Sequence, residues 1–215
     1  HAELTLVDAD GNHTPVHLGI PGRHNVMNAL AAATVAMRYG MAPETVARIL
    51  ASQHTISPHR MALSTVNREG TSFTLIDDSF NANPDSMKAG LNGLKAWNSN
   101  DGKEPFRVAL LGAMLELGAD ETALHTSIGT YADELGIDAI IAVGSVQDQH
   151  LDALAQALAD GARQSQSASV DCVHDIDAAE QLVIDLARNH SDAVVLLKGS
   201  HASGLSALAE RWAKN

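Results

Sequence analysis

The stretch RVALLG (residues 107–112) and two others like it, AIIAVG (139–144) and AVVLLKG (193–199), indicate the fold class. Each is a short, continuous apolar run that ends at a glycine, as expected of a parallel strand buried on both faces of a sheet. Helical patterns separate the three runs, and strand–helix alternation of this kind implies right-handed crossovers. The sequence therefore predicts an α/β fold with a doubly wound, mostly parallel sheet.

The same alternation can be followed from Arg60 to the end of the chain. Strands are predicted at 62–66, 71–76, 107–112, 139–143, 170–173 and 193–198. Helices are predicted at about 84–97, 120–135, 148–160, 175–189 and 203–213.

The first part of the chain has a different pattern. ELTLV (3–7) and TPVHLGI (14–20) predict a β-hairpin. Two helices follow, an Ala-rich one that ends at Gly40 and one that begins at Pro43. These elements look too few and too one-sided to fold well alone. We expect two domains, residues 1–57 and residues 58–215.

The composition excludes several classes of protein. With 45% hydrophobic and 19% charged residues the chain can bury a core, and its formal charge of −12 argues against a nucleic-acid or anionic-membrane partner. No apolar run approaches the roughly 18 residues of a membrane span, and no signal peptide precedes the first strand. Cys172 is the one cysteine, which excludes an internal disulfide and fits a reducing cytoplasm. Because the chain begins at His1 rather than a methionine, we expect it to derive from a longer protein.

The stretch TLIDDSFNANPDSM (74–87) is a candidate ligand loop at the carboxyl end of a predicted strand, where open α/β sheets bind their ligands. Its second half is explained by a helix start, with Asn83 as N-cap and Pro84 at the first helical position. That leaves four polar residues unexplained: Asp77, Asp78, Ser79 and Asn81. Such side chains can hold ribose hydroxyls or amide groups, although an ordinary polar loop is an equal alternative.

Two more strand ends carry candidate residues. LLGAMLELG (110–118) is a glycine turn that carries Glu116. In LLKGSHASG (196–204), Lys198 leaves a buried strand beside Ser200 and before a helix, which indicates an anion site. The alternative for this turn is a plain strand end that Ser203 caps.

A further candidate lies outside the sheet. In GRHNVMN (22–28), Asn25 and Asn28 are three residues apart at the start of a predicted helix, so their side chains share a face. Asparagine is unfavourable inside a helix unless it bonds something specific. A helix start with a local cap remains the alternative.

Several common sites are missing from the sequence. It contains no G-x-x-x-x-G-K-[ST] phosphate loop and no G-x-G-x-x-G fingerprint, so neither a self-sufficient NTPase nor a standard dinucleotide site is supported. The eleven histidines are dispersed without the spacing of metal ligands. We interpret four of them as helix-surface or loop residues: His125, His150, His174 and His190. Cys172, in a predicted buried strand, is interpreted as a core residue rather than a nucleophile.

Five elements, taken in order, resemble the Mur ligases of peptidoglycan synthesis. They are PGRHNVMNALAAA (21–33), PHRM (58–61), DDSFNANPDSM (77–87), LLGAMLELG (110–118) and LLKGS (196–200). The third element is the specific one, and it most resembles the members that add D-alanyl-D-alanine to UDP-N-acetylmuramoyl-tripeptide. The resemblance implies that residues 1–57 end a central ATPase domain and that residues 58–215 form a Rossmann-like C-terminal domain.

The resemblance also implies a reaction and its cofactors. Family members use ATP and Mg²⁺ to convert a peptide carboxylate into an acyl phosphate, which an amine then attacks. The phosphate loop, a carbamylated lysine and the metal ligands are expected upstream of this chain. We therefore expect no catalytic and no metal-binding residue here, a cytoplasmic monomer, and a chain that is inactive alone and binds ATP weakly or not at all.

Residue roles follow from the same resemblance. The expected nucleotide contacts are Asn25, Asn28, Arg60, Asp78 and Asn81, with Asn28 at the adenine and with Arg60 and Asp78 at the ribose and phosphates. The expected substrate contacts are Glu116, Lys198, Ser200 and Ser203. The chain departs from the family pattern at four positions, with His59 for glycine, Phe80 for tyrosine, Ala113 for aspartate and His201 for arginine.

Two other functions fit the same residues. One is another ligase of the superfamily, similar to folylpolyglutamate synthase, although the NANP element favours the D-alanyl-D-alanine-adding members. The other is a non-catalytic α/β ligand-binding module, which the missing phosphate loop supports.

Overall fold

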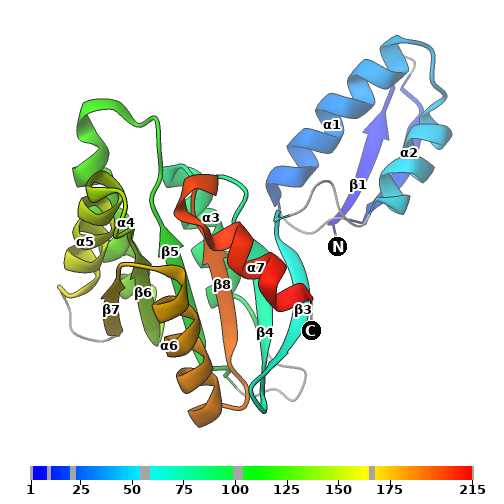
Figure 1. Ribbon diagram of the computed structural model, residues 1–215. Helices are drawn as coiled ribbons and strands as arrows, with labels where there is room; N and C mark the ends of the chain where they lie inside the picture. The colour runs from blue at the N-terminus through cyan, green and yellow to red at the C-terminus, as the bar shows by residue number, and fades with distance from the viewer. Residues whose placement is uncertain are drawn as a thin grey trace. The chain divides into compact units, whose positions relative to one another are not determined.

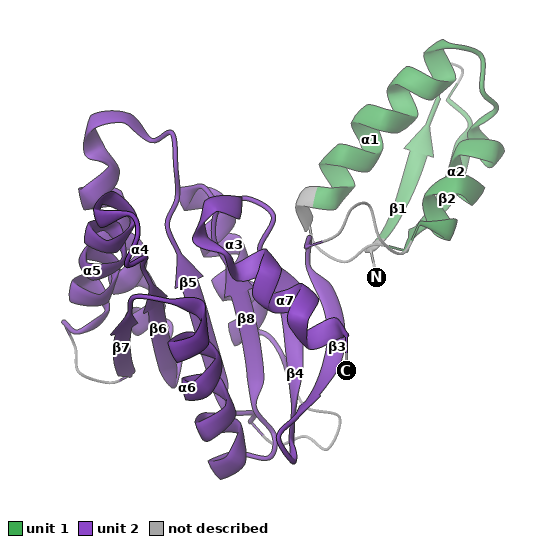
Figure 2. Cartoon of the chain, viewed as in Figure 1, with its two compact units in different colours: residues 1–58 green, residues 59–215 purple. Residues whose placement is uncertain are grey.

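In a computed structural model the chain forms two compact units, His1–Pro58 and His59–Asn215 (Figure 2). The structure describes residues 2–8, 11–19, 23–53, 59–98, 104–164 and 168–214. Each unit has a hydrophobic core of its own. The assignment of the first unit to the end of an ATPase domain remains a prediction.

The first unit is a hairpin covered by two helices. Strands β1 (Ala2–Val7) and β2 (His13–Leu18) pair antiparallel, and helices α1 (Arg23–Arg38) and α2 (Pro43–Ser52) follow. The core joins all four elements through Leu6, Val16, Ala33 and Val46. In β2 buried and exposed residues alternate, which is the pattern of a strand buried on one face.

The second unit is built on a six-stranded sheet with the order β3-β4-β8-β5-β6-β7 (Figure 1). The strands are β3 (Ala62–Arg68), β4 (Thr71–Asp78), β5 (Arg107–Gly112), β6 (Ala139–Val143), β7 (Ser169–Val173) and β8 (Val194–Lys198). Only β3, at one edge, runs antiparallel to its neighbour. The helices are α3 (Pro84–Lys95), α4 (Glu121–Glu134), α5 (Gln149–Ala162), α6 (Ile176–Asn189) and α7 (Leu205–Ala213), with the short 3-10 helices η1 (Gly118–Asp120) and η2 (His201–Ser203).

Helices cover both faces of this sheet. One core contains buried residues of α3, α4 and α5, and the other contains buried residues of α6 and α7. All residues of β5, β6 and β8 are buried, because these central strands are covered on both sides. The predicted doubly wound, mostly parallel α/β fold is therefore confirmed.

Two of the differences from the predicted boundaries concern the candidate loops. Strand β4 continues through Asp77 and Asp78, because their backbone pairs with the end of β8. The last helix begins at Leu205 rather than at 203, because Gly204 adopts a left-handed conformation (φ +76°) that ends η2. Helix α7 begins without a side-chain cap.

Cys172 lies in β7, the edge strand opposite β3. It is half-buried rather than buried, and it packs against the core formed with α3, α4 and α5. Burial raises the pKa of its thiol, which disfavours the reactive thiolate. A packing role agrees with this environment.

Candidate functional site

Three candidate loops lie together at the carboxyl ends of β4, β8 and β5. The three strands are parallel neighbours, with β8 in the middle (Figure 1). The ends are also in register, since Asp78 of β4 is paired with Lys198 of β8, and Lys198 with Leu111 of β5. The sheet thus brings together loops that are far apart in the sequence.

Lys198 is the most deeply buried charge at this edge, with 2% of its surface exposed. Its Nζ lies 2.7 Å from Oδ2 of Asp78 and donates to the carbonyl oxygens of Asn81 (3.0 Å) and Asp78 (3.4 Å). These three contacts use all three ammonium protons. Lys198 therefore holds the loop between β4 and α3 (residues 79–83, the β4 loop) in place, rather than presenting a free charge to a ligand.

Both carboxylate oxygens of Asp78 are engaged. Oδ2 pairs with Lys198, and Oδ1 accepts a hydrogen bond of 3.2 Å from the backbone N–H of Met61. The exposed Asn81 uses its side-chain oxygen to accept from the N–H of Ala82 (2.8 Å). Arg60 is exposed, with its guanidinium 4.3 Å from the centre of the Phe80 ring. Of the residues predicted to contact a nucleotide in this unit, Arg60 therefore has the freest charged group.

The end of the β4 loop is fixed by the predicted helix start. Asn83 accepts from the N–H of Ser86 (2.8 Å), and the hydroxyl of Ser86 accepts from the N–H of Asn83 (3.0 Å). This reciprocal pair, with Pro84 at the first helical position, is a capping box. The loop is consequently held at its beginning by Lys198 and at its end by α3.

The Asp78–Lys198 pair should contribute most to the stability of the edge at which β4, β5 and β8 end, which we call the binding edge. Asp78→Asn removes the countercharge of a buried ammonium, and we expect it to lower the free energy of unfolding by about 3 kcal/mol. Lys198→Met should cost less after Asp78→Asn than in the native chain, with a coupling of about 2 kcal/mol in a urea-unfolding double-mutant cycle. The exposed pair Arg163–Asp160 (3.3 Å) is the matched control, with an expected coupling below about 1 kcal/mol. Additive effects of Asp78→Asn and Lys198→Met would contradict the pairing.

The loop after β5 is held by a histidine that the sequence analysis misplaced. His125 is fully buried rather than on the helix surface. Its Nε2 accepts from the N–H of Met114 (2.9 Å), and its Nδ1 donates to the carbonyl oxygen of Glu121 (2.6 Å). It follows that His125 ties the β5 loop to α4 in one neutral tautomer. The prediction failed because a tertiary partner, the Met114 N–H, has no signature in the helix's own sequence.

The same loop presents Glu116. Its side chain is exposed, and its backbone is left-handed (φ +62°), which is uncommon for a residue with a Cβ.

The other three histidines agree better with their prediction as helix-surface or loop residues. His150 and His174 are exposed, and His190 follows the end of α6.

Stability should depend on pH through His125. Burial lowers the pKa of His125 below its ordinary value of 6.5, so below about pH 6.5 the unfolded chain binds a proton that the folded chain rejects. Native stability should therefore fall as the pH falls through this range, by up to about 1.4 kcal/mol per pH unit.

Urea unfolding between pH 7.5 and pH 5 measures this slope, and His125→Gln should reduce it, because glutamine can accept from Met114 but does not titrate. An unchanged slope in His125→Gln would show that another group is responsible.

The turn after β8 contains the two predicted serines. The N–H of Ser200 donates to the carbonyl oxygen of Ala113 (2.9 Å), which joins this turn to the β5 loop. The hydroxyl of Ser203 donates to the carbonyl oxygen of Ser200 (2.6 Å), and its side chain fills the space beside Gly112 and Gly199, where a Cβ would collide with it. Ser203 is therefore a packing residue.

The hydroxyl of Ser200 has a different environment. The residue is 4% exposed, and its Oγ has no hydrogen-bond partner within the part of the chain that the structure describes. Because buried polar atoms are nearly always paired, this hydroxyl is the best substrate-side candidate.

Asn25 and Asn28 belong to the first unit. As their spacing predicts, they share one face of α1, with Nδ2 of Asn28 donating to Oδ1 of Asn25 over 3.4 Å. Asn25 is buried and Asn28 is exposed.

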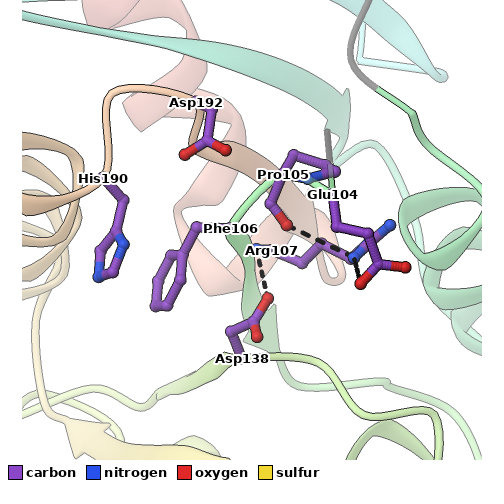
Figure 3. A pocket seen from close by; sticks show the side chains of 7 residues that line it. All are labelled: Glu104, Pro105, Phe106, Arg107, Asp138, His190 and Asp192. Atoms are coloured by element: carbon purple, nitrogen blue, oxygen red, sulfur yellow. Dashed lines mark hydrogen bonds and ion pairs between the residues drawn. The ribbon is translucent and has the colours of Figure 1, made fainter. Parts of the chain in front are cut away.

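A pocket of about 220 Å³ lies at the opposite end of the sheet, where β5 and β6 begin (Figure 3). It is lined by Glu104, Pro105, Phe106, Arg107, Asp138, His190 and Asp192. Arg107 donates there to the carbonyl oxygens of Leu94, Pro105 and Trp97, so its buried charge holds the end of α3. None of the predicted site residues lines this pocket.

Across the described ranges, no three or more His, Cys, Asp or Glu residues are grouped so as to hold a metal ion. Within the same ranges, no helix combines the length and the apolar character needed to cross a membrane.

Comparison with known proteins shows the family of the chain. The family model described as Mur ligase, glutamate ligase domain matches residues 59–201. The chain belongs to the Mur ligase family. The UDP-N-acetylmuramoyl-tripeptide–D-alanyl-D-alanine ligase of Mycobacterium tuberculosis is 39% identical over 205 residues, which cover 91% of this chain and 39% of that protein. The chain thus spans about two fifths of the length of this Mur ligase.

Solved structures give the same result. A crystal structure of MurF from Acinetobacter baumannii matches with a TM-score of 0.78 and 25% identity over 99% of this chain and 42% of that chain. MurF from Thermotoga maritima in complex with ADP matches with a TM-score of 0.65 and 20% identity, which supports the fold alone. The predicted family and fold are confirmed.

Proposed function

We propose that this chain supplies part of an ATP-dependent ligase that joins D-alanyl-D-alanine to UDP-N-acetylmuramoyl-tripeptide in peptidoglycan synthesis. The observation that carries the proposal is the grouping of the β4, β5 and β8 loops at one edge, in a chain that is 39% identical to a ligase of that name. We place the protein in the cytoplasm, since nucleotide substrates are found inside the cell. We also propose that it is a monomer.

The reaction has two steps. A carboxylate oxygen of the tripeptide attacks the γ-phosphorus of ATP, and ADP leaves. The amine of D-alanyl-D-alanine then attacks the acyl carbon, phosphate leaves, and the amine loses a proton. The acyl phosphate is open to hydrolysis, so the protein must keep water away from it.

We assign nucleotide contacts to the residues around the β4 loop. The exposed Arg60 can donate to ribose or phosphate oxygens, and so can the amide N–H₂ of the exposed Asn81. Asp78 shapes this loop through Lys198 and Met61, and its remaining lone pairs can accept from a ribose hydroxyl. In the first unit, the exposed Asn28 offers an amide group for the adenine, with Asn25 beside it.

On the substrate side the four predicted residues divide into two groups. The unpaired hydroxyl of Ser200 and the exposed Glu116 can contact the incoming peptide directly. Lys198 and Ser203 act through the loops that they hold.

Mg²⁺ would neutralise the phosphate charge of ATP. Asp78 is already paired with Lys198, and the described residues include no cluster that fits a metal. We therefore propose that its ligands, like the phosphate loop, belong to the part of the relatives that this chain does not match.

The proposal can be tested with a chimera. This chain replaces the matched segment of the Mycobacterium tuberculosis ligase, and amide formation is measured with ATP, UDP-N-acetylmuramoyl-tripeptide and either D-alanyl-D-alanine or glutamate as amine. We expect ligation with D-alanyl-D-alanine. Ligation with glutamate alone would favour a folylpolyglutamate synthase-like enzyme, and a folded chimera that ligates neither would favour a non-catalytic module.

Arg60→Ala in the same chimera tests the nucleotide contact. Loss of one charged hydrogen bond should raise the KM for ATP by about tenfold or more. Arg163→Ala, which removes a similarly exposed arginine at the C-cap of α5, is the control and should leave the KM unchanged. Equal KM values for the two variants would remove Arg60 from the nucleotide site.

A further inference from the structure

Residues 59–61, just before β3, have an unusual backbone. His59 (φ +61°) and Met61 (φ +48°) are both left-handed, although neither is glycine. Such residues are uncommon, and they persist only where their surroundings hold them in place. Arg60, the proposed nucleotide contact, lies between the two.

Two hydrogen bonds of its backbone groups hold this segment to the end of β4 and the loop that follows it. The N–H of Phe80 donates to the carbonyl oxygen of His59 (3.1 Å), and the N–H of Met61 donates to the carboxylate of Asp78 (3.2 Å). The two bonds lie on either side of Arg60 in the sequence. They set the direction in which its side chain leaves the backbone.

The side chain of His59 adds a third connection. Its Nδ1 lies 2.8 Å from Oδ2 of Asp77, so a ring N–H donates to the carboxylate of a residue that is 8% exposed. The other oxygen of Asp77 accepts from the hydroxyl (2.6 Å) and the N–H (3.2 Å) of Ser79. On its far side the His59 ring meets α7, with Nε2 3.5 Å from the carboxylate of Glu210. The imidazole therefore bridges the end of β4 and α7.

The Asp77 contact accounts for the strained backbone. Ser79 satisfies only one oxygen of the buried carboxylate, and the other depends on the His59 ring. Since a buried carboxylate without a partner is costly, this bond favours the conformation in which His59 is left-handed. A glycine would adopt that conformation without strain but would not reach Asp77.

We propose that His59 is a positioning residue that, through Asp77, aims Arg60 at the nucleotide. The role of the nucleotide in this inference rests on the proposed function. The contacts of His59 with Asp77 and Glu210 do not depend on that function. His59 acts through the backbone of residues 59–61 and through the β4 loop. It does not touch the reacting atoms.

Two substitutions separate the bridge from the backbone strain. His59→Gly relieves the strain and removes the ring. If the ring only fills space, residues 59–61 should be held as firmly in this variant as in the native chain, or more firmly. His59→Asn keeps a donor, because its Nδ2 takes the place of the imidazole Nδ1, and asparagine tolerates the left-handed region. Glu69→Gly, at the left-handed residue (φ +45°) of the β3–β4 turn, is the matched control.

The first measurement is amide hydrogen exchange of Phe80 in the 215-residue chain. We expect exchange about tenfold faster in His59→Gly and nearly native rates in His59→Asn and Glu69→Gly, since local opening exposes the bond to His59. Native exchange of Phe80 in His59→Gly would overturn the bridge, whatever the protein's reaction is.

The second measurement is the ligase reaction of the chimera. His59→Gly should raise the KM for ATP about tenfold while kcat changes less than about threefold, because ground-state nucleotide contacts are misplaced; His59→Asn should restore the KM. Faster exchange without a change in KM would make the bridge structural only and would overturn the positioning role. A chimera with native His59 that ligates nothing would instead refute the proposed function, while the exchange result would still stand for the bridge.

Discussion

The binding edge of the sheet depends on one buried ion pair, Asp78–Lys198. An ammonium with 2% of its surface exposed is tolerated only if its charge and its protons all find partners. Asp78 and the carbonyl oxygen of Asn81 supply them, and so the β4 loop is bound to β8 at its base. The side chain of a central strand thereby fixes a surface loop.

The rest of the site is built outward from this pair. The second oxygen of Asp78 holds Met61, and Met61 and His59 together hold Arg60 between them. On the other side of β8, the N–H of Ser200 holds the β5 loop at Ala113. Each loop is thus fixed at its base, while the side chains of Arg60 and Glu116 are exposed. A site of this kind is largely preformed, which reduces the entropy lost on binding.

The sequence predicted the parts of the structure that depend on local rules. The buried strands read as continuous apolar runs, and α3 begins at Pro84 because Asn83 and Ser86 cap it through neighbouring backbone groups. The polar end of β4 was missed, because Asp77 and Asp78 do not look like strand residues and are held by pairing with β8. His125 was missed for a similar reason, since its partner Met114 belongs to a different element. The loops that carry the second unit's candidate residues lie at one edge of the sheet, but the contacts of each residue could not be predicted, because contacts such as Asp78–Lys198 join residues 120 positions apart.

The central claim is that residues 59–61 and the β4 loop form one side of a nucleotide site. The most direct measurement is a crystal structure of the ligase chimera with ADP. The account predicts the Arg60 guanidinium within about 3 Å of a ribose or phosphate oxygen, with the Asp78–Lys198 pair intact beneath it. ADP bound with no atom of residues 59–61 or 77–81 in contact would contradict the account.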